Sequence, residues 1–435
     1  MTRPDWQQPL SRREALRLST AGVAATSLSG WLPTLAARAS ETKPAAKTKP
    51  KTEPRAKRVV VLWMDGGPPH TDTFDLKPDV AECGIFKPID TKVPGIQISE
   101  LLPQFSKLID RAAIVRSMST IENEHSRAQV HLRTGFRDGQ GGVKWPALGS
   151  ICSQEVGAPD ADLPSYVAIA ERRNKSHGPG FLGTQHQPLY VLNPTRGVEN
   201  LAAPSGQVDQ VSARLGLLGD LEQTFARDYR SPISNDHKTV YARAVQMMRS
   251  SKAKAFDISQ EPAAVREKYG KNRFGEGCLL ARRLLEADVK YIEVGLEGWD
   301  THFENHAAIR GLCAKLDPGM TTFITDLEER GLLDDTLVVW MGEFGRTPKL
   351  KGNGRDHYAK AWTTMFMGAG VRGGQVIGRS DKFGATVEDR PVAVQDFMAT
   401  ICEAVGIDLE KETVLDGGRP VKFVDEKPKP LSELY

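Results

Sequence analysis

The chain has 435 residues, of which 40% are hydrophobic and 26% are charged, and its formal net charge at pH 7 is +3. This composition is normal for a soluble globular protein, and the small net charge gives no reason to expect nucleic-acid binding. The length allows one large α/β domain with insertions, or two domains.

The amino-terminal segment resembles an export signal. Arg12 and Arg13 form a twin-arginine pair, the mildly apolar residues 21–35 follow, and residues 37–39 are an Ala-Arg-Ala cleavage signature. The apolar run is too short and too rich in Ser, Thr and Gly to span a membrane, and no later stretch is long and apolar enough. We therefore predict a cleaved signal at residues 1–39, transport by the twin-arginine translocase, and a periplasmic or secreted protein without a stable membrane span.

The next segment, residues 40–57, is rich in Lys, Pro, Ala and Thr, which predicts a solvated linker. The folded part is expected at residues 58–435, as an α/β domain with insertions around residues 136–260 that shape a substrate cleft. Its five scattered cysteines are odd in number and include no Cys-x-x-Cys pair. Core thiols are the default interpretation, although an oxidising compartment permits one or two disulfide bridges. The cysteines are Cys83, Cys152, Cys278, Cys313 and Cys402.

Short apolar runs bounded by glycine and turn residues predict buried strands, and helical patterns between them predict parallel βαβ units. The predicted strands are residues 58–64, 112–118, 163–170, 289–296, 336–341 and 362–367, with another near the end of residues 178–192. The predicted helices are residues 98–110, one that ends at residue 134, 145–155, 208–228, 236–256, 275–287, one between 300 and 336, and 389–405. The Gly-rich residues 368–378 are expected to form a loop and a hairpin.

Carboxylates and histidines follow the ends of three of these strands. In doubly wound sheets, ligands bind at the carboxyl ends of the strands. Asp65, Asp300 and Glu343 occupy such positions, and His302 and His357 lie on the adjoining loops. Mixed oxygen and imidazole sets suit a divalent metal, so Asp300, His302, Glu343 and His357 are the predicted metal site, and Asp65 is a further candidate for a functional role.

Each of these residues also has a plainer interpretation. Asp65 precedes two glycines and could be a turn residue, His302 could be a loop histidine bonded to a carboxylate, and Glu343 could simply pair with Arg346. Asp356 is a candidate to orient the neighbouring imidazole of His357 from outside the metal site.

A nucleophile would be expected where the strand at 112–118 meets the following helix. Helix amides favour an anion there, and the candidates are Ser119, Thr120, Ser126 and His125. A hydroxyl at such a position is more often a helix cap.

Four motifs resemble those of one exported family. They are MDGGP at 64–68, WDTH at 299–302, GEFGRTP at 342–348 and GRDH at 354–357. Together they look like the motifs of the domain-of-unknown-function 1501 family, within the alkaline phosphatase and sulfatase superfamily. The resemblance covers nearly the whole folded part. It implies a three-layer α/β/α sandwich with a mostly parallel sheet, and one or two divalent metal ions such as zinc, calcium or manganese.

The resemblance also implies roles for individual residues. Asp65 matches the first metal carboxylate of the superfamily, Asp300 and His302 match a middle ligand pair, Glu343 a later carboxylate, and His357 the last histidine ligand.

Catalytic roles are implied for His125, Ser126, Arg127 and Arg346. His125 stands roughly where a sulfatase has its nucleophile, beside Ser126 and Arg127, and no cysteine there could be matured to formylglycine. Arg346 is expected to neutralise the oxyanion of a sulfate or phosphate ester. Phe344 stands where many members have His or Asn.

Two functions from different classes follow. The first is a metal-dependent hydrolase of sulfate or phosphate esters, on small molecules or exported glycans, in which the metal activates water or a hydroxyl. The second is a non-catalytic exported protein that binds an anionic ligand or a partner.

Overall fold

The computed structural model describes residues 53–158, 160–201, 210, 213–214, 216–219, 232–415, 417–424 and 427–435. The predicted signal at 1–39, the greater part of the linker at 40–57 and most of the helix predicted at 208–228 lie outside these residues. The described residues belong to one compact unit, Glu53–Tyr435. This unit begins before residue 58, because Ala56 is fully buried and its backbone N–H donates to the carbonyl of Ala404 at 2.8 Å.

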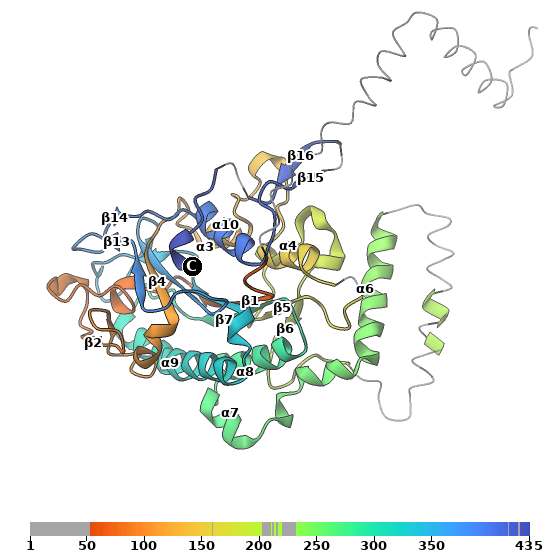
Figure 1. Cartoon of the computed structure of the whole chain (residues 1–435), viewed down its shortest axis with the longest axis horizontal. Coiled ribbons are helices and arrows are strands. Elements are labelled where there is room, and N and C mark those ends of the chain that lie inside the picture. The colour runs from red at the N-terminus through yellow and green to blue at the C-terminus, as the bar shows by residue number, and fades with distance from the viewer. Residues whose placement is uncertain are drawn as a thin grey trace, which may run out of the picture. The chain divides into compact units, whose positions relative to one another are not determined.

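An eight-stranded sheet forms the centre of the unit (Figure 1). Only β11 runs antiparallel to its neighbours within this sheet, and every other neighbouring pair is parallel. The mostly parallel sheet is therefore confirmed. In spatial order its strands are β12 (Gln375–Ile377), β4 (Ala112–Met118), β11 (Trp362–Met367), β8 (Thr336–Met341), β1 (Arg58–Asp65), β7 (Tyr291–Glu297), β5 (Tyr166–Ile169) and β6 (Leu189–Val191).

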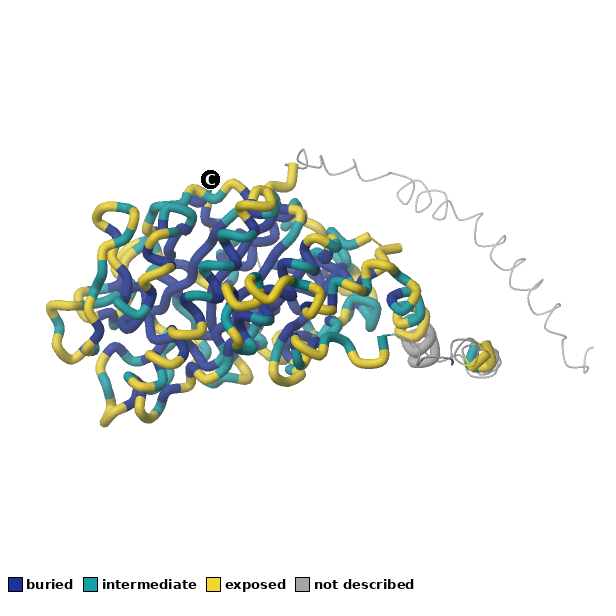
Figure 2. Tube along the Cα trace, turned by 90° about the horizontal axis from the view of Figure 1, so that it is seen from below, coloured by how far each residue is buried: buried dark blue, intermediate teal, exposed yellow. Residues whose placement is uncertain are grey.

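Helices cover both faces of this sheet, as side-chain alternation along β1 shows. Val60, Leu62 and Met64 belong to the apolar core that contains α8 (Arg273–Glu286) and α9 (Asn305–Glu329). The intervening Val59, Val61 and Trp63 belong to the other core, with α3 (His125–Thr134), α4 (Leu148–Glu155) and α10 (Val394–Ala404). The three-layer α/β/α arrangement is confirmed, and Figure 2 shows the buried interior running through the unit.

The other strands and α-helices that the structure describes are short or peripheral. They are β2 (Pro88–Asp90), β3 (Gln97–Ser99), β9 (Gly345–Arg346), β10 (His357–Tyr358), β13 (Arg379–Ser380), β14 (Val387–Asp389), β15 (Glu412–Val414), β16 (Pro420–Lys422), α6 (Pro232–Arg249) and α7 (Ala263–Tyr269). All five cysteines are buried and free, so the core-thiol interpretation is confirmed. Among the described residues, no helix combines the length and the apolar character that crossing a membrane requires.

Two predicted elements are wrong. The helix expected at 98–110 is instead the end of β3, a turn, and a 3-10 helix at Phe105–Arg111. Pro103 falls inside the predicted helix, where it has no N–H to donate, and the carboxylate of Asp317 accepts the next two backbone N–H groups at 3.0 and 2.8 Å. The hairpin expected at 368–378 does not form, because β12 pairs with β4, which lies between β12 and β11 in the sheet.

Candidate metal centre

Three strand ends deliver the candidate residues to one edge of the sheet. In register, Asp65 of β1 lies opposite Glu297 of β7, and β8 runs parallel to β1 on its other side. Gly66, just beyond β1, has φ +114°, and an added Cβ would lie 2.4 Å from the backbone nitrogen of Asp300. A glycine is therefore required for these two loops to touch.

The loop that carries His357 packs equally closely on the loop that carries His302. A Cβ at Gly354 would lie 1.7 Å from the carbonyl oxygen of His302. His125 enters from the opposite side as the first residue of α3, whose start is capped by the Glu124 carboxylate.

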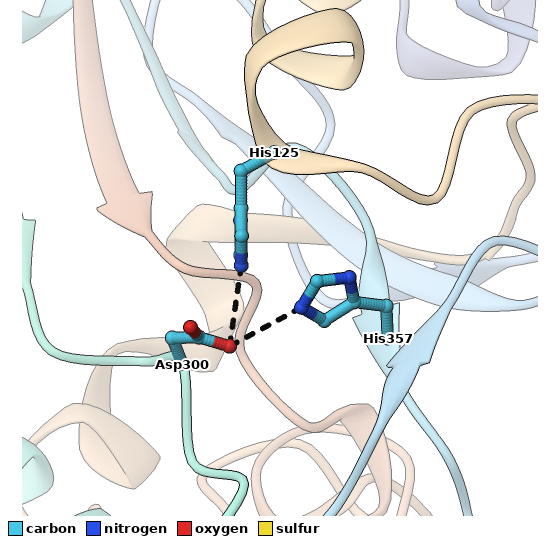
Figure 3. A group of neighbouring side chains, drawn as sticks. All are labelled: His125, Asp300 and His357. Carbon is cyan, nitrogen blue, oxygen red and sulfur yellow. Dashed lines mark hydrogen bonds and ion pairs between the residues drawn. The ribbon is translucent and has the colours of Figure 1, made fainter.

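The side chains of His125, His302 and His357 converge on the carboxylate of Asp300. Their Nε2 atoms lie 3.2, 3.2 and 3.3 Å from its Oδ1 atom, and the Nε2 atoms of His302 and His357 are 3.0 Å apart. Figure 3 shows His125 and His357 pointing at Asp300 from two sides. The ligand atoms of His125, Asp300 and His357 all lie within 4.8 Å of one another. We call His125, Asp300, His302 and His357 the cluster.

Each imidazole of the cluster is held through its other ring nitrogen by an oxygen acceptor. The Nδ1 contacts are His125 with Glu343 Oε1 at 2.7 Å, His302 with Asp356 Oδ1 at 3.1 Å, and His357 with the Asn123 carbonyl at 2.7 Å. When Nδ1–H donates to such an acceptor, a neutral ring presents the lone pair of Nε2. This is the arrangement typical of metal-binding histidines.

The residues present fit a divalent cation. Two Nε2 lone pairs 3.0 Å apart repel each other unless a proton or a cation lies between them. His125 Nε2 is buried and has no hydrogen-bond partner in the described part of the chain, although it lies 3.2 Å from Asp300 Oδ1. Four ligands at zinc distances of about 2.0–2.2 Å would lie roughly 3.4 Å apart, close to the spacings measured around Asp300.

Charges around the cluster keep Asp300 ionised. Burial raises its pKa, but the hydrogen bond and charge of Arg346, together with His125, outweigh this and lower the pKa to about 2. Burial lowers the pKa of His125, and Glu343 and Asp300 outweigh it, so this pKa is raised. For His357 burial dominates and the pKa is lowered, which favours a neutral ring.

Glu343 lies behind the cluster. Its side chain is 0% exposed. Its Oε1 atom accepts hydrogen bonds from His125 Nδ1, from the Gly66 backbone N–H at 3.0 Å and from Gln129 Nε2 at 3.4 Å. Asp65 also lies outside the cluster, with Gln129 Nε2 at 2.5 Å from its Oδ1. Burial and the charge of Glu343 raise the pKa of Asp65. Of the five predicted metal ligands, Asp65 and Glu343 thus lie outside the cluster. His125, which was not predicted as a ligand, belongs to it.

Arg346 has no exposed side-chain surface. Its guanidinium donates to the carbonyls of Gly66, Gly67 and Arg355 and to the carboxylate of Asp300. Arg346 is therefore placed to hold Asp300, and not to contact a substrate oxyanion as expected. Arg172 is different, because its side chain is 69% exposed and its Nη2 lies 3.4 Å from Asp65 Oδ2.

Ser126 and Arg127 are exposed at the start of α3. Their backbone N–H groups donate to the capping carboxylate of Glu124, and the Arg127 side chain donates to Glu122 at 3.0 Å. Among the residues expected to be catalytic, only His125 joins the cluster. Sequence reasoning missed Gln129, although its spacing of four residues from His125 indicates the same helix face.

Comparison with known protein families identifies the family of this chain. A family model described as "Protein of unknown function (DUF1501)" matches residues 56–435. The chain belongs to the DUF1501 family. The resemblance of its sequence motifs to this family is thereby confirmed.

The DUF1501 chain is also similar to several solved structures. The lipoteichoic acid synthase LtaP from Listeria monocytogenes is 9% identical, with a TM-score of 0.39 over 86% of this chain and 76% of that one. The PsFucS1 sulfatase from Pseudoalteromonas sp. is 12% identical, with a TM-score of 0.39 over 82% and 68%. The periplasmic domain of EcEptC from Escherichia coli, in complex with Zn, is 10% identical, with a TM-score of 0.39 over 85% and 93%. Comparison with curated proteins gives no match.

Proposed function

We propose that this DUF1501 protein is an exported, metal-dependent hydrolase of sulfate or phosphate esters. The observation that carries the proposal is the cluster, in which three imidazole nitrogens lie 3.2–3.3 Å from Asp300 Oδ1. Three imidazoles and one carboxylate favour zinc over calcium, which prefers an all-oxygen set. Manganese remains an alternative, since it accepts carboxylate and imidazole together.

The protein groups around the cluster have separable tasks. A bound ion would lower the pKa of a water molecule and stabilise negative charge on the leaving oxygen. Arg346 and the Nδ1 contacts hold Asp300 and the imidazoles in place. The exposed guanidinium of Arg172 is suited to a sulfate or phosphate group, because it can donate two parallel hydrogen bonds.

The attacking group we propose is water. Within the described ranges, no hydroxyl or thiol side chain is hydrogen-bonded to His125, Asp300, His302 or His357. A covalent intermediate on serine, threonine or cysteine therefore has no supporting contact. The same observation favours the second candidate, a non-catalytic exported protein that uses the centre to bind an anionic ligand.

Metal content and hydrolysis test these candidates together. Purified protein should contain bound zinc or manganese by mass spectrometry, and it should hydrolyse 4-nitrophenyl sulfate or phosphate. His302→Ala should lose both metal and activity. His186→Ala is the matched control, since His186 bonds Ser153 at 3.1 Å, outside the cluster. Bound metal without hydrolysis of any ester would favour the binding protein, and a metal-free protein with full activity would contradict the proposal.

A further inference from the structure

Two carboxylates lie side by side beneath the cluster, and an amide lies between them. Asp65 ends β1 and Glu343 follows β8, and their side chains are 15% and 0% exposed. Gln129 Nε2 lies 2.5 Å from Asp65 Oδ1 and 3.4 Å from Glu343 Oε1. The other Glu343 oxygen, Oε2, is buried and has no hydrogen-bond partner in the part of the chain described.

The orientation of this amide is set by its neighbours. Gln129 is buried on α3, and its Oε1 atom accepts from Asn174 Nδ2 at 2.5 Å. Asn174 Oδ1 in turn accepts from the backbone N–H and the hydroxyl of Ser176 at 3.0 and 2.9 Å. This chain of contacts turns the NH₂ group of Gln129 toward the two carboxylates.

A buried pair of carboxylates with a shared point between them is a natural place for a divalent cation. Without one, their mutual repulsion is costly at low dielectric. The amide NH₂ of Gln129 donates hydrogen bonds to Asp65 Oδ1 and Glu343 Oε1 and so replaces part of the attraction that a cation would supply. It carries no charge, however, and it leaves Glu343 Oε2 without a hydrogen-bond partner among the described residues.

We propose that Gln129 occupies the position of a second cation and thereby limits the centre to one ion. This inference rests on the proposed function, because it concerns the number of ions in the same centre. It also names the class of hydrolase. A reaction that uses two ions clamps both the attacking and the leaving oxygen, whereas a one-ion centre must neutralise the substrate anion with a side chain. Arg172, beside Asp65, is the exposed cation placed to do so.

The test counts ions in the whole purified protein. Wild-type protein stripped with a chelator is titrated with zinc by calorimetry, and bound metal is counted by mass spectrometry after dialysis. Gln129→Glu adds a third carboxylate to the pair and should raise the count from one ion to two per chain. Gln97→Glu is the matched control, because Gln97 also donates Nε2 to an aspartate, Asp90, at 2.8 Å, but on an exposed surface. It should leave the count at one.

Each result bears on a definite statement. Two ions in the wild type overturn the inference while leaving a metal centre in place. One ion in a folded Gln129→Glu variant, verified by circular dichroism, also overturns it. If that variant does not fold, Gln129→Asp supplies the same charge on a shorter side chain and should bind the second ion. No ion in the wild type contradicts the metal centre itself, and the inference fails with it.

Discussion

Asp356 contacts His302, one of the proposed metal ligands, on the ring nitrogen that faces away from the cluster. Its Oδ1 atom accepts from His302 Nδ1 at 3.1 Å, and its Oδ2 atom binds Lys351 Nζ at 3.0 Å. A carboxylate behind a metal-binding histidine fixes the ring and raises its basicity, and loss of such a partner costs about 10–100-fold in metal affinity.

Asp356→Asn keeps the size of this side chain and removes its charge. We expect zinc affinity to fall by about 10–100-fold, as measured by competition with a chromophoric chelator. Asp381→Asn is the control, since Asp381 accepts hydrogen bonds within its own loop. An unchanged affinity in Asp356→Asn would show that the carboxylate does not act through His302.

Arg172 provides a second test at the same scale, directed at substrate rather than metal. Loss of a hydrogen bond to a charged group costs about 1.5–3 kcal/mol, which corresponds to roughly 10–100-fold. Arg172→Ala should therefore raise KM for a sulfate or phosphate ester by that factor, with the metal content unchanged. Arg173→Ala is the control, because Arg173 lies over the Tyr190 ring instead. Equal KM values in the two variants would remove Arg172 from the substrate site.

At the scale of elements, α3 is fastened to the sheet by a buried ionic network. Glu293 of β7 binds Arg133 of α3 at 2.6 and 3.1 Å and His177 at 2.7 Å. The guanidinium of Arg133 also lies 3.6 Å from the centre of the Trp63 ring. Because α3 carries His125, this network also sets the position of one member of the cluster.

The network predicts a pH dependence of stability. Burial raises the pKa of Glu293, but Arg133 and His177 outweigh it and lower the pKa to about 2. A carboxylate with a depressed folded-state pKa stabilises the protein above its unfolded pKa of roughly 4.3, and that stabilisation is lost as pH falls toward 2. Urea unfolding from pH 7 to 3 should show this loss in the wild type.

Glu293→Gln should be less stable at neutral pH by about 3–5 kcal/mol, because Arg133 is left buried without its anion. The decrease of its unfolding free energy at acid pH should also be smaller than in the wild type, by the part that Glu293 contributes. Glu388→Gln, at an exposed pair with Arg379, should keep the wild-type slope. Identical slopes in the Glu293→Gln variant and the wild type would assign the acid sensitivity to other groups.

Elements differed in how far the sequence could predict them. The runs at 112–118, 336–341 and 362–367 are strands at those same residues, because continuous apolar runs between turn residues have few other uses in a parallel sheet. The helix predicted at 98–110 failed although Leu102, Phe105 and Ile109 are buried as its spacing required. Hydrogen bonds from the backbone to the distant Asp317 side chain fix the conformation there. The spacing of apolar residues along the chain contains no information about such contacts.

The candidate site was predictable to the level of loops, not of atoms. The parallel order of the strands was sufficient to predict that three residues would lie close together, namely Asp300, His302 and His357. Whether Glu343 or His125 faces the same point depends on the Gly66 turn and on how α3 lies against the sheet. These are packing outcomes, so spacing along the chain could not choose between them.

For the molecule as a whole, the cluster exists only once the chain has folded, because its members come from α3, from the loop after β7 and from β10. An ion bound before export would therefore require the folded protein to cross the membrane. The paired Arg12 and Arg13 of the proposed signal suit such transport.

Conservative replacement of the pair tests this route. With Arg12 and Arg13 both changed to Lys, the positive charge remains but the twin-arginine element is lost, so the precursor should stay in the cytoplasm with residues 1–39 attached. Cell fractionation, immunoblotting and amino-terminal sequencing measure both features. Arg17→Lys, a single equivalent change nearby, should be exported and cleaved as the wild type is. Normal export of the double variant would show that export does not depend on this pair. An uncleaved wild-type protein outside the cytoplasm would instead contradict the cleavage signature at 37–39.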